Sequence, residues 1–70
     1  MRLPNKLFRF SESVFADMTN ILTVLRHPSK VYELYQKVKN QMSVDRYIEA
    51  LEILFALDKI IYEGELIYVS

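Results

Sequence analysis

Apolar residues recur at helical spacing in three successive segments of the chain, each opened by a serine. Ser11 or Ser13 is placed to cap a first helix that runs to about Arg26, because serine accepts hydrogen bonds from the free amides of a first turn. One apolar stripe follows the helical period along this segment, made of Val14, Phe15, Met18, Ile21, Leu22 and Leu25. Proline disfavours the helical conformation of the residue before it, so His27-Pro28 ends the helix.

Two further helices are predicted downstream. Ser29 is placed to cap a helix to roughly Asn40, in which Val31, Leu34, Tyr35 and Val38 recur at i, i+3, i+4 and i+7. After a short turn, Ser43 is placed to cap a third helix from Val44 to about Leu57. Apolar side chains in this third helix exceed the stripe of about 100° that a surface helix needs. Either the rest of the chain or a partner protein must cover the excess.

The C-terminal end predicts a β-hairpin. Ile60-Ile61-Tyr62 and residues 65–69 are two β-rich runs, joined by a turn at Glu63-Gly64 that contains the single glycine of the chain. Ile60 and Tyr62 fall on one face of the hairpin and Ile61 on the other. Asp58 is expected in a left-handed conformation at the end of the third helix, because aspartate tolerates positive φ better than most residues. Three helices followed by a hairpin predict an α+β fold, mostly α, of the winged-helix type.

Residues 1–12 predict an extended arm or short strand. Pro4 biases its neighbour away from the helical region, and Leu7, Phe8 and Phe10 are bulky residues interleaved with basic ones. The expected organisation is therefore an arm over residues 1–12 and a winged-helix domain over residues 13–70. The 70 residues form one domain overall.

Composition excludes several classes of function. The chain has no cysteine and one histidine, His27, so the sequence offers neither a thiolate nor a histidine-pair metal site. No nucleophile motif or glycine-rich phosphate loop is present, and we expect a non-enzymatic protein without a cofactor. No run approaches the roughly 18 apolar residues of a membrane span, and the N-terminus lacks the apolar core of a signal peptide. A cytoplasmic protein with no membrane contact is the resulting expectation.

Charge argues against groove recognition of DNA by the third helix. Residues 1–40 hold seven Lys/Arg against three Asp/Glu, whereas residues 41–70 hold two against six. The polar residues of the third helix are Asp45, Arg46, Glu49 and Glu52, and carboxylates facing phosphates oppose the counterion release that drives non-specific binding. A weaker phosphate contact elsewhere would use Arg26, Lys30, Lys37 and Lys39, together with basic residues of the arm.

The apolar excess instead predicts a protein-binding surface, because bulky apolar and aromatic side chains dominate interface energies. The predicted partner-binding residues come from the arm, the third helix and the hairpin: Leu7, Phe8, Phe10, Ile48, Phe55, Ile61, Ile67 and Tyr68. If Phe8 or Phe10 anchors a partner, its replacement by alanine should weaken binding by roughly 1 to 3 kcal/mol.

Three segments carry a family resemblance. The opening Leu3-Pro4-Asn5-Lys6-Leu7-Phe8-Arg9-Phe10 with Glu12-Ser13-Val14, the central Val31-Tyr32-Glu33-Leu34-Tyr35, and the closing Ala50 to Ile60 resemble the small middle components of bacterial ABC three-component systems. Loci of this kind, including the Lamassu type, encode such a protein between a large SMC/Rad50-like ABC ATPase and an effector. Where a glycine is usual after the third helix, this chain has Asp58.

The resemblance implies an accessory subunit in defence against phage or plasmids. Its partners would be the ATPase and an effector that bears a nuclease, and it would have no active site of its own. A small DNA-binding transcriptional regulator or antitoxin-like protein is the principal alternative, which the salt dependence of duplex binding would distinguish. A homodimer that uses the same apolar hairpin is a third interpretation.

Overall fold

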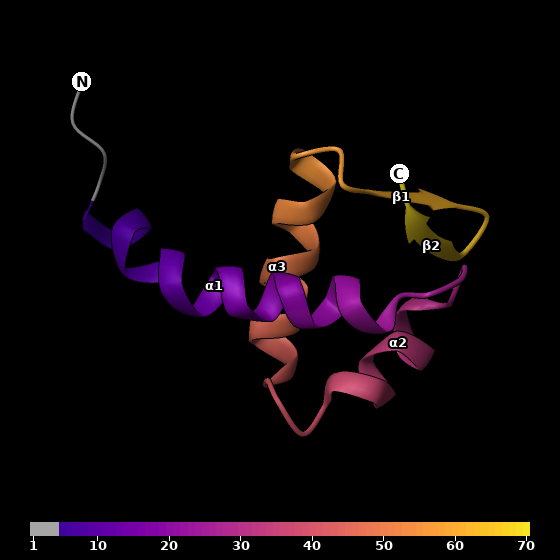
Figure 1. The fold of residues 1–70 in the computed structure, drawn as a ribbon, viewed down its shortest axis with the longest axis horizontal. Coiled ribbons are helices and arrows are strands. Elements are labelled where there is room, and N and C mark those ends of the chain that lie inside the picture. The colour runs from indigo at the N-terminus through magenta and orange to yellow at the C-terminus, as the bar shows by residue number, and fades with distance from the viewer. Residues whose placement is uncertain (1–4) are drawn as a thin grey trace.

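The winged-helix-like fold predicted from the sequence is confirmed. The computed structural model describes the backbone of residues 5–70 and the side chains of residues 13–70. Three helices, α1 (Asn5–Val24), α2 (Val31–Val38) and α3 (Val44–Ala56), precede an antiparallel hairpin of β1 (Ile60–Glu63) and β2 (Leu66–Val69). Figure 1 shows α3 crossing α1, with α2 and the hairpin grouped near the C-terminal end of α1.

The N-terminal segment differs from the prediction. Helix α1 begins at Asn5, so the extended conformation expected up to residue 12 is wrong for residues 5–12. Pro4 explains the difference, because proline restricts the residue before it and not the residues that follow, and it is tolerated next to the start of a helix. The N-terminal part of α1, which the sequence did not predict to be helical, projects past α3 in Figure 1.

The core lies where the three helices and the hairpin meet. Its fully buried members come from the three helices and β2: Ile21 of α1, Leu34 and Val38 of α2, Tyr47, Ala50 and Leu54 of α3, and Ile67 of β2. Burying an aliphatic or aromatic side chain contributes about 1.5–3 kcal/mol, so these residues supply much of the driving force for folding. Phe15, which the sequence placed on the apolar stripe of the first helix, is instead exposed.

One of the two predicted downstream caps is confirmed. The Ser43 hydroxyl accepts a hydrogen bond from the Arg46 amide at 3.3 Å and caps α3. Ser29 does not cap α2. The N-cap of α2 is Lys30. The backbone of the buried Ser29 pairs with the hairpin instead, and its hydroxyl donates a hydrogen bond to the carbonyl of His27, before α2. The tertiary pairing of its backbone therefore outweighs the local capping preference of serine.

Pairing with Ser29 also fixes the orientation of the hairpin. The Ser29 amide donates to the Ile67 carbonyl at 3.0 Å, and the Ile67 amide donates to the Ser29 carbonyl at 2.7 Å. Ile67 lies opposite Tyr62, on the face that also carries the buried Ile60. An isolated hairpin is marginal in water, and this third backbone segment ties it to the body of the domain.

The hairpin turn lies one residue later than predicted. Glu63 belongs to β1 and pairs with Leu66, which leaves Gly64 and Glu65 as the two turn residues. Both have positive φ, 54° and 74°, the combination that matches the twist of a two-residue hairpin. The left-handed conformation predicted for Asp58 at the end of α3 is confirmed, with φ of 60°.

Candidate partner-binding groove

An open apolar groove runs between α2 and the N-terminal half of α3. Val31, Tyr32 and Tyr35 form one wall, and Val44, Tyr47 and Ile48 form the other, around a hollow of about 330 Å³. The wall residues include three large side chains that stay substantially in water: Tyr32 is 72% exposed, Val44 54% and Ile48 42%. Exposed apolar side chains gathered in one concave place are a feature of binding surfaces, whereas single ones are ordinary.

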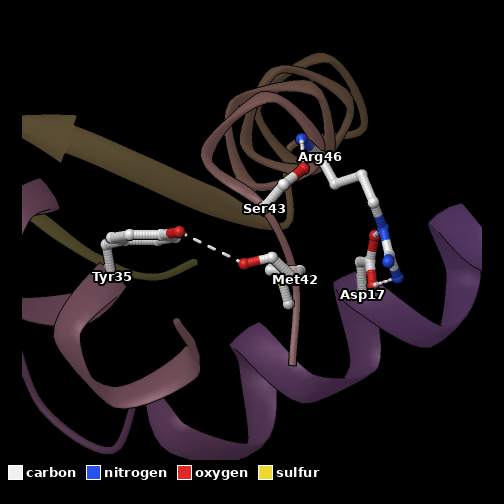
Figure 2. A network of polar contacts seen from close by, with 5 residues as sticks. All are labelled: Asp17, Tyr35, Met42, Ser43 and Arg46. Atoms are coloured by element: carbon white, nitrogen blue, oxygen red, sulfur yellow. Dashed lines mark hydrogen bonds and ion pairs between the residues drawn. The ribbon is translucent and has the colours of Figure 1, made fainter. Parts of the chain in front are cut away.

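Two of the groove tyrosines have already used their hydroxyls inside the protein. Tyr47 donates its hydroxyl to the Val31 carbonyl at 2.7 Å, and Tyr35 donates to the Met42 carbonyl at 3.2 Å, as Figure 2 shows for Tyr35. Their rings are 4.8 Å apart between centroids and tilted by 46°. Burial raises the pKa of Tyr47 to about 12, so this hydroxyl stays protonated over the physiological range. The ring of Tyr47 is buried and forms the floor of the groove, whereas the half-buried ring of Tyr35 leaves apolar surface open to a ligand.

An acidic strip lies beside the groove on α3. A second, more open hollow of about 420 Å³ is lined by Asp45, Arg46, Glu49 and Glu52, and Ile48 lines both hollows. Spacings of four and three residues place the three carboxylates on neighbouring turns of one helical face. We refer to Asp45, Glu49 and Glu52 as the acidic strip.

Arg46 does not neutralise this strip, because its charge is already paired with α1. Its Nε donates to one carboxylate oxygen of Asp17 at 2.9 Å, and its Nη2 donates to the other at 2.7 Å (Figure 2). The Asp17 side chain is 3% exposed, whereas that of Arg46 is 48% exposed. The hydrogen bond to Asp17, followed by the attraction of its charge, raises the pKa of Arg46 above its ordinary value.

The structure separates the predicted partner-binding residues. Ile48 lies in the groove and Ile61 is exposed on the hairpin. Phe55 is half-buried and packs edge-to-face on Tyr62, with 6.1 Å between the ring centroids. Tyr68 is half-buried, and its hydroxyl donates to the Glu63 carboxylate at 2.6 Å, which raises the pKa of Tyr68. The expectation that Ile67 lies at the surface is wrong, because its face of the hairpin rests on the core.

Other predicted contacts are less constrained by the fold. The side chains of Leu7, Phe8 and Phe10 lie outside the described residues. The four basic residues expected to reach phosphates, Arg26, Lys30, Lys37 and Lys39, are all exposed. They are spread over the α1–α2 connection, α2 and its C-cap, and none lines the α3 hollow that carries the acidic strip.

Sequence reasoning missed Tyr32 and Val44 as groove residues, and it missed the pairing of Asp17 with Arg46. Tyr32 carried a signal, because it stands outside the apolar stripe of Val31, Leu34, Tyr35 and Val38 and so had no core position to fill. The ion pair carried none, since its partners are 29 residues apart and their meeting depends on how α1 crosses α3.

Fold and surface together define the class as a small winged-helix-like domain with an apolar groove beside an acidic helix face. Over residues 13–70 no group of three or more His, Cys, Asp or Glu side chains is arranged to hold a metal ion. No helix within the described part of the chain is both long and apolar enough to cross a membrane.

Comparison with known families identifies the family of the chain. The model of the family described as ABC-three component (ABC-3C) system Middle Component 7 matches residues 3–67, and the chain belongs to this family. The resemblance to middle components is thereby confirmed, and with it the interpretation of the chain as an accessory component of a three-component system. Comparison with curated proteins and with solved structures found no significant match.

Proposed function

We propose that this chain is a non-catalytic adaptor that binds an SMC/Rad50-like ABC ATPase and an effector protein, and that the system acts in defence against phage or plasmids, as Lamassu-type systems do. Membership of a middle-component family supports the existence of partner components. We further propose that these partners are the ATPase and a nuclease-bearing effector.

The observation that carries the adaptor role is the groove between α2 and α3. The side chains of Tyr32, Val44 and Ile48 in its walls are exposed to water. The hydroxyls of Tyr35 and Tyr47 already donate hydrogen bonds within the protein. Covering such side chains releases about 25 cal/mol for each Å² of apolar surface removed from water. A protein partner that buries the groove therefore gains binding energy without breaking internal hydrogen bonds.

Other surfaces contribute to the proposed interface. Ile61 of β1 is exposed and remains in the proposal, while Phe55 and Tyr68 can contribute only their accessible edges. Leu7, Phe8 and Phe10 remain as contacts proposed from the sequence. Ile67 leaves the set because it is fully buried.

Charge disfavours the alternative of a DNA-binding regulator. The face of α3 that a helix-turn-helix protein places in the major groove carries the acidic strip, and the one arginine on it is paired with Asp17. Contacts from Arg26, Lys30, Lys37 and Lys39 would add phosphate affinity without sequence information.

Co-purification with the two other components of the system tests the proposal. We expect the tagged chain to retain at least one of them in 0.5 M salt, about three times the physiological value, where exposed charge pairs are strongly screened. Val44→Asp should reduce retention while leaving α3 folded, because an acidic residue suits a first helical turn. Thr19→Asp on the exposed side of α1 is the control. Retention of neither component, together with duplex DNA binding that falls steeply with salt, would favour the regulator.

A further inference from the structure

The groove and the acidic strip adjoin each other, and together they restrict what can bind. Ile48 lines both hollows, so a ligand seated in the groove can reach Glu49 and Glu52. The charge of Arg46 is compensated by Asp17, which leaves the three carboxylates of the strip to set the sign of the local potential. A ligand with basic side chains along that edge is favoured, and an acidic one is repelled.

The walls of the groove also restrict the backbone of the ligand. Both walls are α-helices, whose interior amides and carbonyls are bonded within each helix, so they offer no row of free backbone groups like that of a sheet edge. A bound segment therefore receives no backbone hydrogen bonds from the walls. A helix needs none because it bonds its own backbone, whereas an extended strand that binds by pairing with a sheet edge finds no edge here.

From this combination we infer that the α2–α3 groove binds an amphipathic helix of another component of the system, with apolar residues facing Tyr32, Val44 and Ile48 and lysine or arginine residues along the acidic strip. This inference rests on the proposed adaptor function and adds the chemistry of the occupant. The ligand helix would carry apolar residues at i, i+3, i+4 and i+7 and its basic residues on the flank nearest Glu49 and Glu52.

Photo-crosslinking within the assembled complex tests the occupant directly. The crosslinking residue p-benzoyl-L-phenylalanine replaces Tyr32 in the groove or, in a matched control, the exposed Tyr62 of the hairpin. The complex with the two other components is irradiated, and the linked peptide is identified by mass spectrometry. We expect the groove position to link to a segment with helical apolar spacing and a net positive charge, and the hairpin position to link elsewhere or not at all.

Three results would overturn the inference while leaving the adaptor function intact: a link to an acidic segment, a link to a β-strand, or a complex that forms without any link from the groove position. A link to a second copy of this chain would also overturn it, since the occupant would then be the chain itself. Failure of the complex to form would remove the adaptor function and the inference together.

The charge component has its own measurement. The double variant Glu49→Gln and Glu52→Gln should weaken binding of the crosslinked component by about two- to tenfold at low salt, with a smaller difference at high salt. The matched control, Asp58→Asn at the end of α3 with Glu65→Gln in the hairpin turn, removes the same charge from exposed positions outside the acidic strip. Equal effects of the two double variants would show that net charge, and not the acidic strip, governs binding.

Discussion

Replacement of Arg46 by methionine tests how strongly the ion pair between α1 and α3 supports the fold. The substitution keeps a long, mostly apolar side chain but removes both hydrogen bonds to Asp17, at 2.9 and 2.7 Å. The Asp17 carboxylate, 3% exposed, then has no cation to offset the cost of its burial. Losing these donors leaves the buried carboxylate unpaired and costs about 1.5–3 kcal/mol, less than for a fully buried pair because Arg46 is half-exposed.

That cost is large for a domain of this size. At about 0.05–0.15 kcal/mol per residue, 70 residues give a total unfolding free energy of about 4–10 kcal/mol. With a urea dependence of about 1 kcal/mol per molar for a small domain, the denaturation midpoint of Arg46→Met should fall by about 1.5–3 M. Urea titration followed by far-ultraviolet circular dichroism measures this shift.

Two further variants show whether the loss comes from the stranded carboxylate. Arg26→Met removes an exposed arginine beyond the end of α1 and should change stability by less than about 0.5 kcal/mol. The double variant Asp17→Leu with Arg46→Met removes both charges and should recover most of the stability. The reasoning is refuted if Arg46→Met costs less than about 1 kcal/mol, or if the double variant is no more stable than the single one.

Other predictions concern the groove, the caps and DNA. The pKa of Tyr47 is raised from 10 to about 12 in the folded state, so its contribution to stability is complete below pH 10 and is lost as the pH rises towards 12. When the free energy of unfolding is measured against pH, Tyr47→Phe should reduce the slope between pH 10 and about 12. An unchanged slope would contradict the raised pKa. Gly64→Ala should destabilise the protein by about 1 kcal/mol, because φ of 54° is unfavourable for alanine. Asp58→Gly should stabilise the protein by about 0.5–1 kcal/mol, because φ of 60° suits glycine better than aspartate. Melting temperatures that shift in the same direction for both variants would contradict this reasoning. The isolated chain should show no duplex DNA binding at physiological salt in a fluorescence anisotropy titration, and sub-micromolar affinity would contradict the electrostatic argument.

Local signals in the sequence were sufficient for the type and order of the elements. The helical recurrence of Val31, Leu34 and Val38, the serine before α3 and the glycine in the turn each report a preference that the fold also satisfies. Asp58 could be predicted for the same reason, because positive φ is a property of the residue itself.

Features that depend on tertiary pairing could not be predicted in this way. Ser29 has the local preference of a cap, yet its backbone pairs with Ile67, which is 38 positions away in the chain. The burial of Ile67 follows from that same pairing. The groove likewise depends on the angle between α2 and α3, so the sequence could indicate an apolar excess on the third helix but not that Tyr32 would face Val44 and Ile48 across a hollow.

In the proposed adaptor, another component of the system covers the groove. Isothermal titration calorimetry measures the affinity of the co-purified component for the parent chain and for Ile48→Glu. Thr23→Glu, on the exposed surface of α1, is the charge-matched control. We expect Ile48→Glu to bind at least about tenfold more weakly, a difference of about 1.4 kcal/mol, and Thr23→Glu to bind like the parent. Equal affinity of Ile48→Glu and the parent chain would contradict the proposal that the groove is covered.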